Sequence, residues 1–198
     1  MNKLFCLLAY AFLMLAALGC SPDPAKKPAY SKLHQLQAYI TSPAGTNARF
    51  TYDAGKGKIV AHYTTPKDSL LQFLPYPGNY GFIPGTMADT ARGGDGQPLD
   101  ILVLAQATEA SKTQEVIPVA VVHIAKPTGT DFCVIAVPSR PSERIIDVTT
   151  YAGLAKKFPA VKQILNLWFM HHDGQNQNRI MSWKDEKAAD AEVRKWLR

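Results

Sequence analysis

Two aspartates at a turn are the residues of this chain best suited to chemistry. Asp95 and Asp100 stand at the two ends of the segment DGQPLD, which leads into the apolar residues 101–104. Carboxylates that converge at the mouth of a β-structure are the ligands that a hard cation such as Mg²⁺ requires. The alternative interpretation is structural, with Asp95 in a turn and Asp100 as the cap of the strand.

The stretch around these aspartates, residues 76–104, resembles the signature region of the family I inorganic diphosphatases. It reads YPGNYGFIPGTMADTARGGDGQPLDILVL, and a second similar segment, TDFCVIAV, occupies residues 130–137. The resemblance extends over residues 39–183 and implies an Mg²⁺-dependent enzyme that hydrolyses pyrophosphate to phosphate. It implies three kinds of site residue: the metal ligands Asp95, Asp100 and Asp131, the catalytic residues Asp95 and Tyr80, and the substrate-binding residues Arg49, Tyr80, His62 and His172.

Among the departures from the family pattern, three bear most directly on activity. Gln97 stands where the family has an aspartate that helps to activate water, and an amide cannot accept a proton at neutral pH. Cys133 replaces a phosphate-binding lysine and is expected to be a buried strand residue rather than a reactive thiol. Lys126 replaces an acidic residue; it either contacts phosphate or remains a surface lysine. These changes predict a degraded site.

Several of the implied binding residues also have structural interpretations. The two tyrosines of the segment YPGNYGF, Tyr80 among them, would only pack against the core if the turn had no function. His62 is a lone strand histidine of a kind that often has a structural role. His172 falls on the apolar face of a predicted helix and would then be a core or rim residue.

Two functions follow from this pattern of matches and departures. The first is Mg²⁺-dependent hydrolysis of pyrophosphate at a reduced rate. The second is a non-catalytic descendant that binds a phosphorylated ligand or a protein partner. A different hydrolase on the same scaffold is a third reading, because fold does not fix function. The oligomeric state is not readable from the sequence.

The N-terminus has the pattern of an export signal. Lys3 is followed by an apolar run at residues 4–18 and by Gly19-Cys20. We assign residues 1–19 to a signal peptide and Cys20 to lipidation, which predicts a periplasm-facing lipoprotein of the bacterial envelope anchored to a membrane by lipid. Residues 20–30, rich in Pro and Lys, are predicted to be a tether. An ordinary signal peptide with a chance cysteine is the alternative.

Composition limits the other functions. The net charge is +6, and Lys and Arg are spread along the chain, which argues against a nucleic-acid partner. Three cysteines are present, and Cys133 alone belongs to the folded body, so no disulfide framework is expected there.

The elements that must position these residues belong to one α+β domain, mainly β, over residues 31–198. Strand patterns occur first, including a hairpin, and helical patterns fill the last third. The resemblance implies a small closed five-stranded OB-like barrel with flanking C-terminal helices. Ser182 and Asp185 are expected to cap the last helix. The predicted strands cover residues 49–52, 59–63, 99–104, 115–124 and 132–137, and the predicted helices begin at Val148, at Pro159 and after Asp185.

Overall fold

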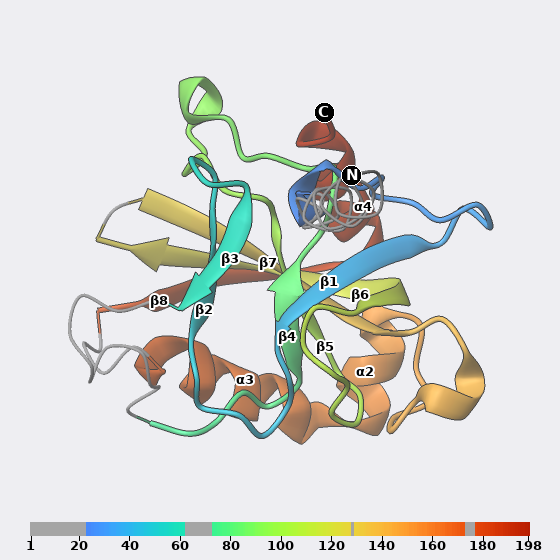
Figure 1. Ribbon diagram of the computed structural model, residues 1–198. Coiled ribbons are helices and arrows are strands. Elements are labelled where there is room, and N and C mark those ends of the chain that lie inside the picture. The colour runs from blue at the N-terminus through green and yellow to red at the C-terminus, as the bar shows by residue number, and fades with distance from the viewer. Residues whose placement is uncertain (1–22, 62–72, 128, 173–176) are drawn as a thin grey trace, which may run out of the picture.

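The computed structural model describes residues 23–61, 73–127, 129–172 and 177–198. Strands are the commonest regular element in this part of the chain, and the α-helices are concentrated near its C-terminus (Figure 1). The helices are α2 (Tyr151–Lys157), α3 (Pro159–His171) and α4 (Glu186–Lys195). The mainly β architecture with flanking C-terminal helices agrees with the predicted fold class.

Five strands form a ring-like sheet. The order is β1–β4–β5–β7–β6, and the ring closes because β6 also pairs with β1. Neighbouring strands are antiparallel except β5 and β7, which are parallel. This ring confirms the predicted five-stranded OB-like fold. Its strands are β1 (Leu36–Ser42), β4 (Asn79–Phe82), β5 (Asp100–Val103), β6 (Thr113–Lys126) and β7 (Gly129–Pro138).

Both faces of the central strands are buried. In β5, Ile101 and Val103 belong to the apolar cluster that includes Val193 of α4. Leu102, which points to the other face, belongs to the cluster that includes Trp168 of α3. Figure 1 shows α4 on one side of the sheet and α2 with α3 on the other. Burial on two faces explains why residues 101–104 are all apolar instead of alternating with polar residues.

Gly81 permits the close approach of β4 to β1. A Cβ atom built at Gly81 would lie 1.9 Å from the carbonyl oxygen of Tyr39, a distance that no side chain tolerates. Ring closure at this point therefore requires glycine. Residues 76–82 were predicted to form a turn, whereas the second half of that segment is β4. Its Asn and Gly residues hide a strand that is held by pairing on both sides.

An additional strand, β8 (Arg179–Asp185), lies outside the ring and was not predicted. It pairs with residues 120–125 of β6. The contact between β1 and β6 covers only residues 113–116 of β6, so without β8 the backbone groups farther along this edge of β6 would be unpaired. Ser182 lies within β8, so the expected capping box does not form. Asp185 caps α4 instead, and its side chain accepts a hydrogen bond from the Ala188 amide at 3.0 Å.

Two helical predictions need correction. The helix predicted from Val148 begins at Tyr151, because the Thr150 hydroxyl accepts a hydrogen bond from the Gly153 amide at 3.1 Å and fixes the start there. Helical spacing predicts that Ile164 shares the apolar face of α3 with Leu165, but its side chain is 55% exposed. The buried stripe of α3 is centred on Leu165, Trp168 and Phe169, so Ile164 lies beyond its edge.

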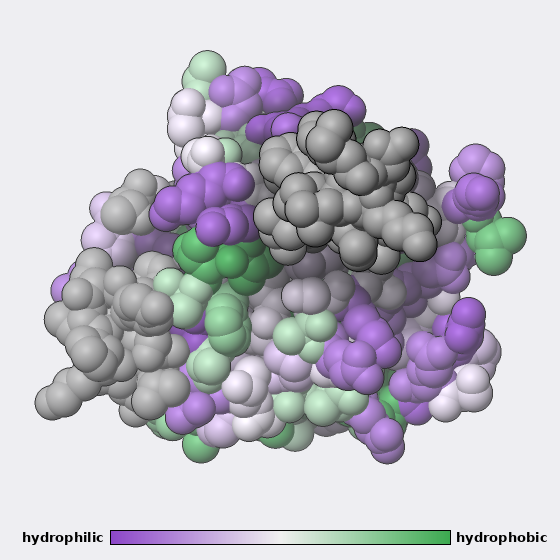
Figure 2. Space-filling model, in the orientation of Figure 1, coloured by the Kyte–Doolittle hydropathy of each residue, from purple (hydrophilic) through white to green (hydrophobic). Residues whose placement is uncertain are grey.

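The predicted hairpin consists of β2 (Phe50–Asp53) and β3 (Lys58–Ala61), paired in antiparallel register from Phe50 opposite Ala61. The last predicted residues of its second strand, 62–63, lie outside the described residues. Apolar side chains gather over this hairpin on the face shown in Figure 2, in keeping with the half-buried residues of β3.

Residues 23–30 pack on the domain, although they were assigned to the tether. Ala25 and Ala29 are buried, and the Gly85 amide donates a hydrogen bond to the Ala25 carbonyl at 2.9 Å. Tyr52 of β2 donates to the carboxylate of Asp23 at 2.9 Å. These contacts extend the folded body to Asp23, on the N-terminal side of the boundary predicted at residue 30. Within the described residues, no helix has the length and apolarity to cross a membrane.

Candidate active site

A cavity of about 190 Å³ opens between the β2–β3 hairpin, the ring and the C-terminal end of α3. It brings together residues that are far apart in the sequence. The predicted site residues that line it are Arg49, Tyr80, Asp95, Asp100, Asp131 and His172. His62, the remaining predicted binding residue, lies outside the described residues, as does Cys20.

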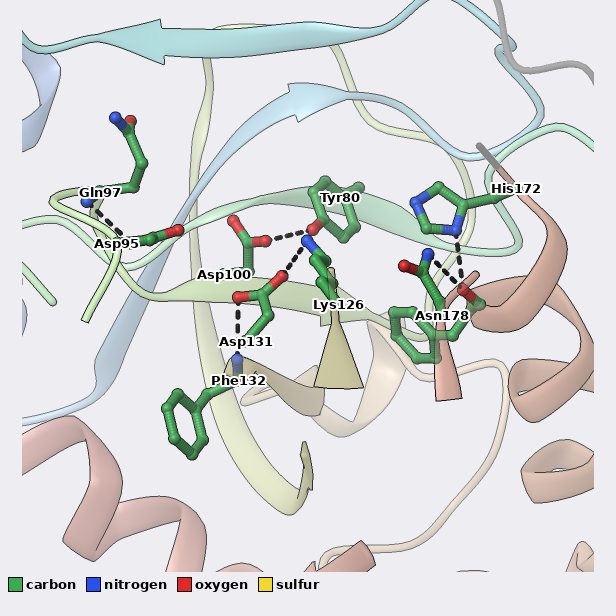
Figure 3. A network of polar contacts seen from close by, with 10 residues as sticks. Tyr80, Asp95, Gln97, Asp100, Lys126, Asp131, Phe132, His172 and Asn178 are labelled. Carbon is green, nitrogen blue, oxygen red and sulfur yellow. Dashed lines mark hydrogen bonds and ion pairs between the residues drawn. The ribbon is translucent and has the colours of Figure 1, made fainter. Parts of the chain in front are cut away.

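The strand register explains why three of these side chains meet. Asp100 of β5 lies opposite Phe82 of β4 on one side and Cys133 of β7 on the other. Tyr80 and Asp131 are each two residues from those partners, and side chains two residues apart project from the same face of a sheet. Figure 3 shows the resulting group, with Lys126 at its centre.

Tyr80 and Asp100 form a short contact at the floor of the cavity. The Tyr80 hydroxyl donates to Asp100 Oδ2 at 2.5 Å. Burial and the negative charge of Asp131 raise the pKa of the Asp100 carboxyl to about 8. Burial and the charge of Asp100 also raise the pKa of Tyr80 well above its usual range. Asp100 therefore keeps its proton at neutral pH unless a cation compensates its charge.

Asp131 is paired with Lys126. The ammonium contacts Asp131 Oδ2, and the Phe132 amide donates to Asp131 Oδ1 at 2.8 Å. Burial lowers the pKa of Lys126, but the negative charges of Asp131 and Asp100 outweigh burial and leave this pKa raised. Lys126 is thus a charged cavity residue, and the alternative of a surface lysine does not hold.

Asp95 lies at the rim of the cavity, where its Oδ1 accepts a hydrogen bond from the Gln97 amide at 2.9 Å (Figure 3). This contact fixes the turn that precedes β5 and keeps Gln97 at the cavity wall. Asp95 therefore stabilises a turn, as its alternative interpretation predicts. Its second carboxylate oxygen remains available to a ligand.

The donor set suits a hard cation in part. In the described part of the chain, Asp95 and Asp100 each keep one oxygen without a hydrogen-bond donor, whereas both oxygens of Asp131 are engaged. No three His, Cys, Asp or Glu side chains among the described residues are grouped so that they could hold one metal ion. Two carboxylates can thus contribute to a magnesium site. A role for Asp131 as a third ligand stays a prediction.

Aromatic residues form the wall opposite the aspartates. Trp168 is buried, and its indole N–H donates to the carbonyls of Leu74 and Pro75 at 3.1 and 3.0 Å. Its ring stacks on His172, with centroids 4.5 Å apart, and His172 Nδ1 lies 3.1 Å from the Phe169 carbonyl. His172 is thus a rim residue held by Trp168. Trp168 lines the cavity although it is not among the predicted site residues.

Two further residues belong to this region: Cys133 lies opposite Asp100 in the sheet, and Tyr52 lines the cavity. Cys133 is 1% exposed, and burial raises the pKa of its thiol well above the usual range, which confirms the expected buried strand residue. Tyr52 lines the cavity but was not singled out, although it lies on the same strand pattern as Arg49. Its hydroxyl is engaged by Asp23, so it links the N-terminal segment to the cavity.

The fold and the cavity define a class of protein: a closed β-barrel that places carboxylates, which can bind a cation, beside basic side chains, which can bind an anion. The family profile of inorganic pyrophosphatase matches residues 38–198. The chain belongs to this family.

Individual relatives agree with the family match. An inorganic pyrophosphatase of Campylobacter jejuni is 30% identical over 162 residues, which cover 79% of this chain and 86% of the relative. Inorganic pyrophosphatase 1 of Pseudomonas syringae pv. tomato is 36% identical over 126 residues, covering 61% and 67%. The crystal structure of the Thermus thermophilus inorganic pyrophosphatase superposes with a TM-score of 0.71 at 27% identity, covering 87% of this chain and 95% of that one.

Proposed function

We propose that this protein hydrolyses pyrophosphate to phosphate in the presence of Mg²⁺, at a reduced rate. The observation that carries the proposal is one cavity that contains Asp95, Asp100 and Asp131 together with the basic residues Arg49 and Lys126. The family membership and the names of the relatives support the same reaction.

The size of the cavity favours a small anion. Pockets for drug-sized ligands are roughly 300–1,000 Å³, and this cavity is about 190 Å³. The space suits an inorganic phosphoanion better than a nucleotide.

Each residue has a role that its chemistry allows. Asp95 and Asp100 would hold Mg²⁺, which supplies charge neutralisation and a more acidic bound water. Arg49 binds a phosphate group through its planar guanidinium. Tyr80 positions the Asp100 carboxyl through its hydroxyl and borders the substrate. His172, at the rim, is a further residue proposed to contact the anion.

The reduced rate follows from Gln97. Its side-chain amide cannot take a proton from water, and general base catalysis increases the rate by about a hundredfold to ten-thousandfold. The remaining catalysis would come from positioning and electrostatic stabilisation.

Phosphate release from pyrophosphate by the purified protein, measured with Mg²⁺ and with excess chelator, tests the proposal. We expect slow release that requires Mg²⁺. The alternative function, binding of a phosphorylated ligand without turnover, is favoured by Gln97 and by the Lys126–Asp131 pair. Tight binding of pyrophosphate with no release above the uncatalysed rate would establish that alternative and exclude hydrolysis.

We also propose export and lipid anchoring at Cys20, on the sequence pattern of residues 1–20. Asp23 already belongs to the folded body, so a lipid on Cys20 would hold the domain close to the membrane surface. Fractionation of cells that express the full chain tests this. The protein should sediment with membranes, and the Cys20→Ser variant should not; an unmodified, soluble wild type would contradict the proposal.

A further inference from the structure

Lys126 differs from the surface lysines of the chain. Its side chain is 34% exposed, compared with 58% for Lys112 and 76% for Lys26. It lies at the end of β6 and reaches into the cavity that Asp95 and Asp100 also line. In Figure 3 its ammonium lies between the Asp131 carboxylate and the Tyr80–Asp100 contact.

The position of this ammonium determines which carboxylates remain available. Asp131 uses one oxygen to accept from the Phe132 amide and the other to bind Lys126. A metal ion at Asp131 would have to share an oxygen with one of these partners and would lie close to the positive charge of Lys126, which disfavours it. Asp95 and Asp100 have no such competition for their second oxygens within the described residues. The cavity thus separates into an open pair of carboxylates and one that already has a cation.

We propose that Lys126 is a built-in cation that takes the place of one divalent ion beside Asp131 and contacts the bound phosphoanion directly. An ammonium has three N–H donors, so it can bind Asp131 with one and a phosphate oxygen with another. It supplies positive charge at any Mg²⁺ concentration. This inference rests on the proposed function only in taking pyrophosphate as the ligand, and it does not require turnover.

The number of metal ions taken up with the ligand tests the proposal. Imidodiphosphate, an analogue whose bridging nitrogen resists hydrolysis, is titrated into the protein by calorimetry at a series of free Mg²⁺ concentrations. In the Lys126→Met variant the Asp131 carboxylate becomes available to a second ion. For each tenfold decrease in free Mg²⁺, the affinity of Lys126→Met for imidodiphosphate should therefore fall by an additional factor of about ten compared with the wild type. At high Mg²⁺ this affinity should recover.

Two variants serve as controls. Lys126→Arg keeps the charge and should retain the Mg²⁺ dependence of the wild type. Lys112→Met removes a lysine that is paired with Glu109 outside the cavity, and it should bind like the wild type. Thermal unfolding followed by circular dichroism establishes that each variant is folded before titration.

The outcomes separate this inference from the proposed function. If the affinity for imidodiphosphate depends on Mg²⁺ equally in the wild type and in Lys126→Met, the proposal that Lys126 replaces a divalent ion is overturned, even if pyrophosphate is hydrolysed. A uniform loss of affinity in both Lys126 variants at all Mg²⁺ concentrations would also overturn it, since that pattern indicates a structural role. The expected change in Mg²⁺ dependence without any phosphate release would support the inference and exclude hydrolysis. No binding by the wild type would overturn the inference.

Discussion

The Gln97→Asp variant is expected to hydrolyse pyrophosphate with a kcat about a hundredfold or more above that of the wild type. Gln97 lines the cavity, and its backbone N–H donates a hydrogen bond to the Asp95 side chain. The backbone that would carry the new carboxylate is therefore already fixed at the cavity wall. An aspartate at this position can accept a proton from water, which glutamine cannot. Phosphate release at saturating Mg²⁺ and pyrophosphate measures the gain.

Gln97→Asn is the matched control for this experiment. Asparagine has the shape of aspartate but no titratable oxygen, so its kcat should stay near that of the wild type. In Gln97→Asp the rate should decrease as the pH falls through the pKa of the new carboxyl group, and Gln97→Asn should lack this acid limb. An equal gain in both variants would mean that side-chain length, rather than a base, limits the wild-type rate.

Asp100→Asn is expected to lower kcat/KM by about a hundredfold or more at fixed Mg²⁺. A hundredfold corresponds to about 2.7 kcal/mol of lost transition-state stabilisation, which is within the several kcal/mol that a bound cation supplies. Asparagine still offers an oxygen to the Tyr80 hydroxyl, so the short contact at the cavity floor can persist. Steady-state phosphate release measures the loss.

The same variant is also expected to change how stability depends on pH, and this can be measured independently of activity. The pKa of Asp100 is about 8 in the folded protein, above its ordinary value of 3.8, so the folded state binds this proton more tightly than the unfolded state. Its contribution to stability is present at low pH and is lost as the pH rises toward 8. Without divalent cations, the Tm of Asp100→Asn relative to the wild type should therefore increase between pH 5 and pH 9.

Asp147→Asn is the control for both measurements. The Asp147 side chain is 86% exposed and pairs with Arg144, away from the residues that line the cavity. It should change neither kcat/KM nor the dependence of Tm on pH. A loss of activity in Asp147→Asn equal to that in Asp100→Asn would contradict a specific role for Asp100.

Local patterns were sufficient for much of the fold. The apolar runs predicted β5, β6 and β7 within a few residues, and the turn between residues 53 and 58 predicted the β2–β3 hairpin. Pro159 marked the start of α3. These elements carry their signals in neighbouring residues. By contrast, β4 and β8 have weak local signals, because β4 is short and glycine-containing and β8 depends on a free edge of β6.

The sequence by itself determined which chemical groups the protein possesses: three aspartates that match the family pattern, a turn with two tyrosines and an amide where a base would be needed. The tertiary structure decided how those groups share the cavity. Residues 126 and 131 are close in the chain, but whether a lysine there faces solvent or three carboxylates depends on the pairing of β5, β6 and β7. Charge pairing acts through space over a few ångströms, so the partner of Lys126 could not be known until the strands were in register.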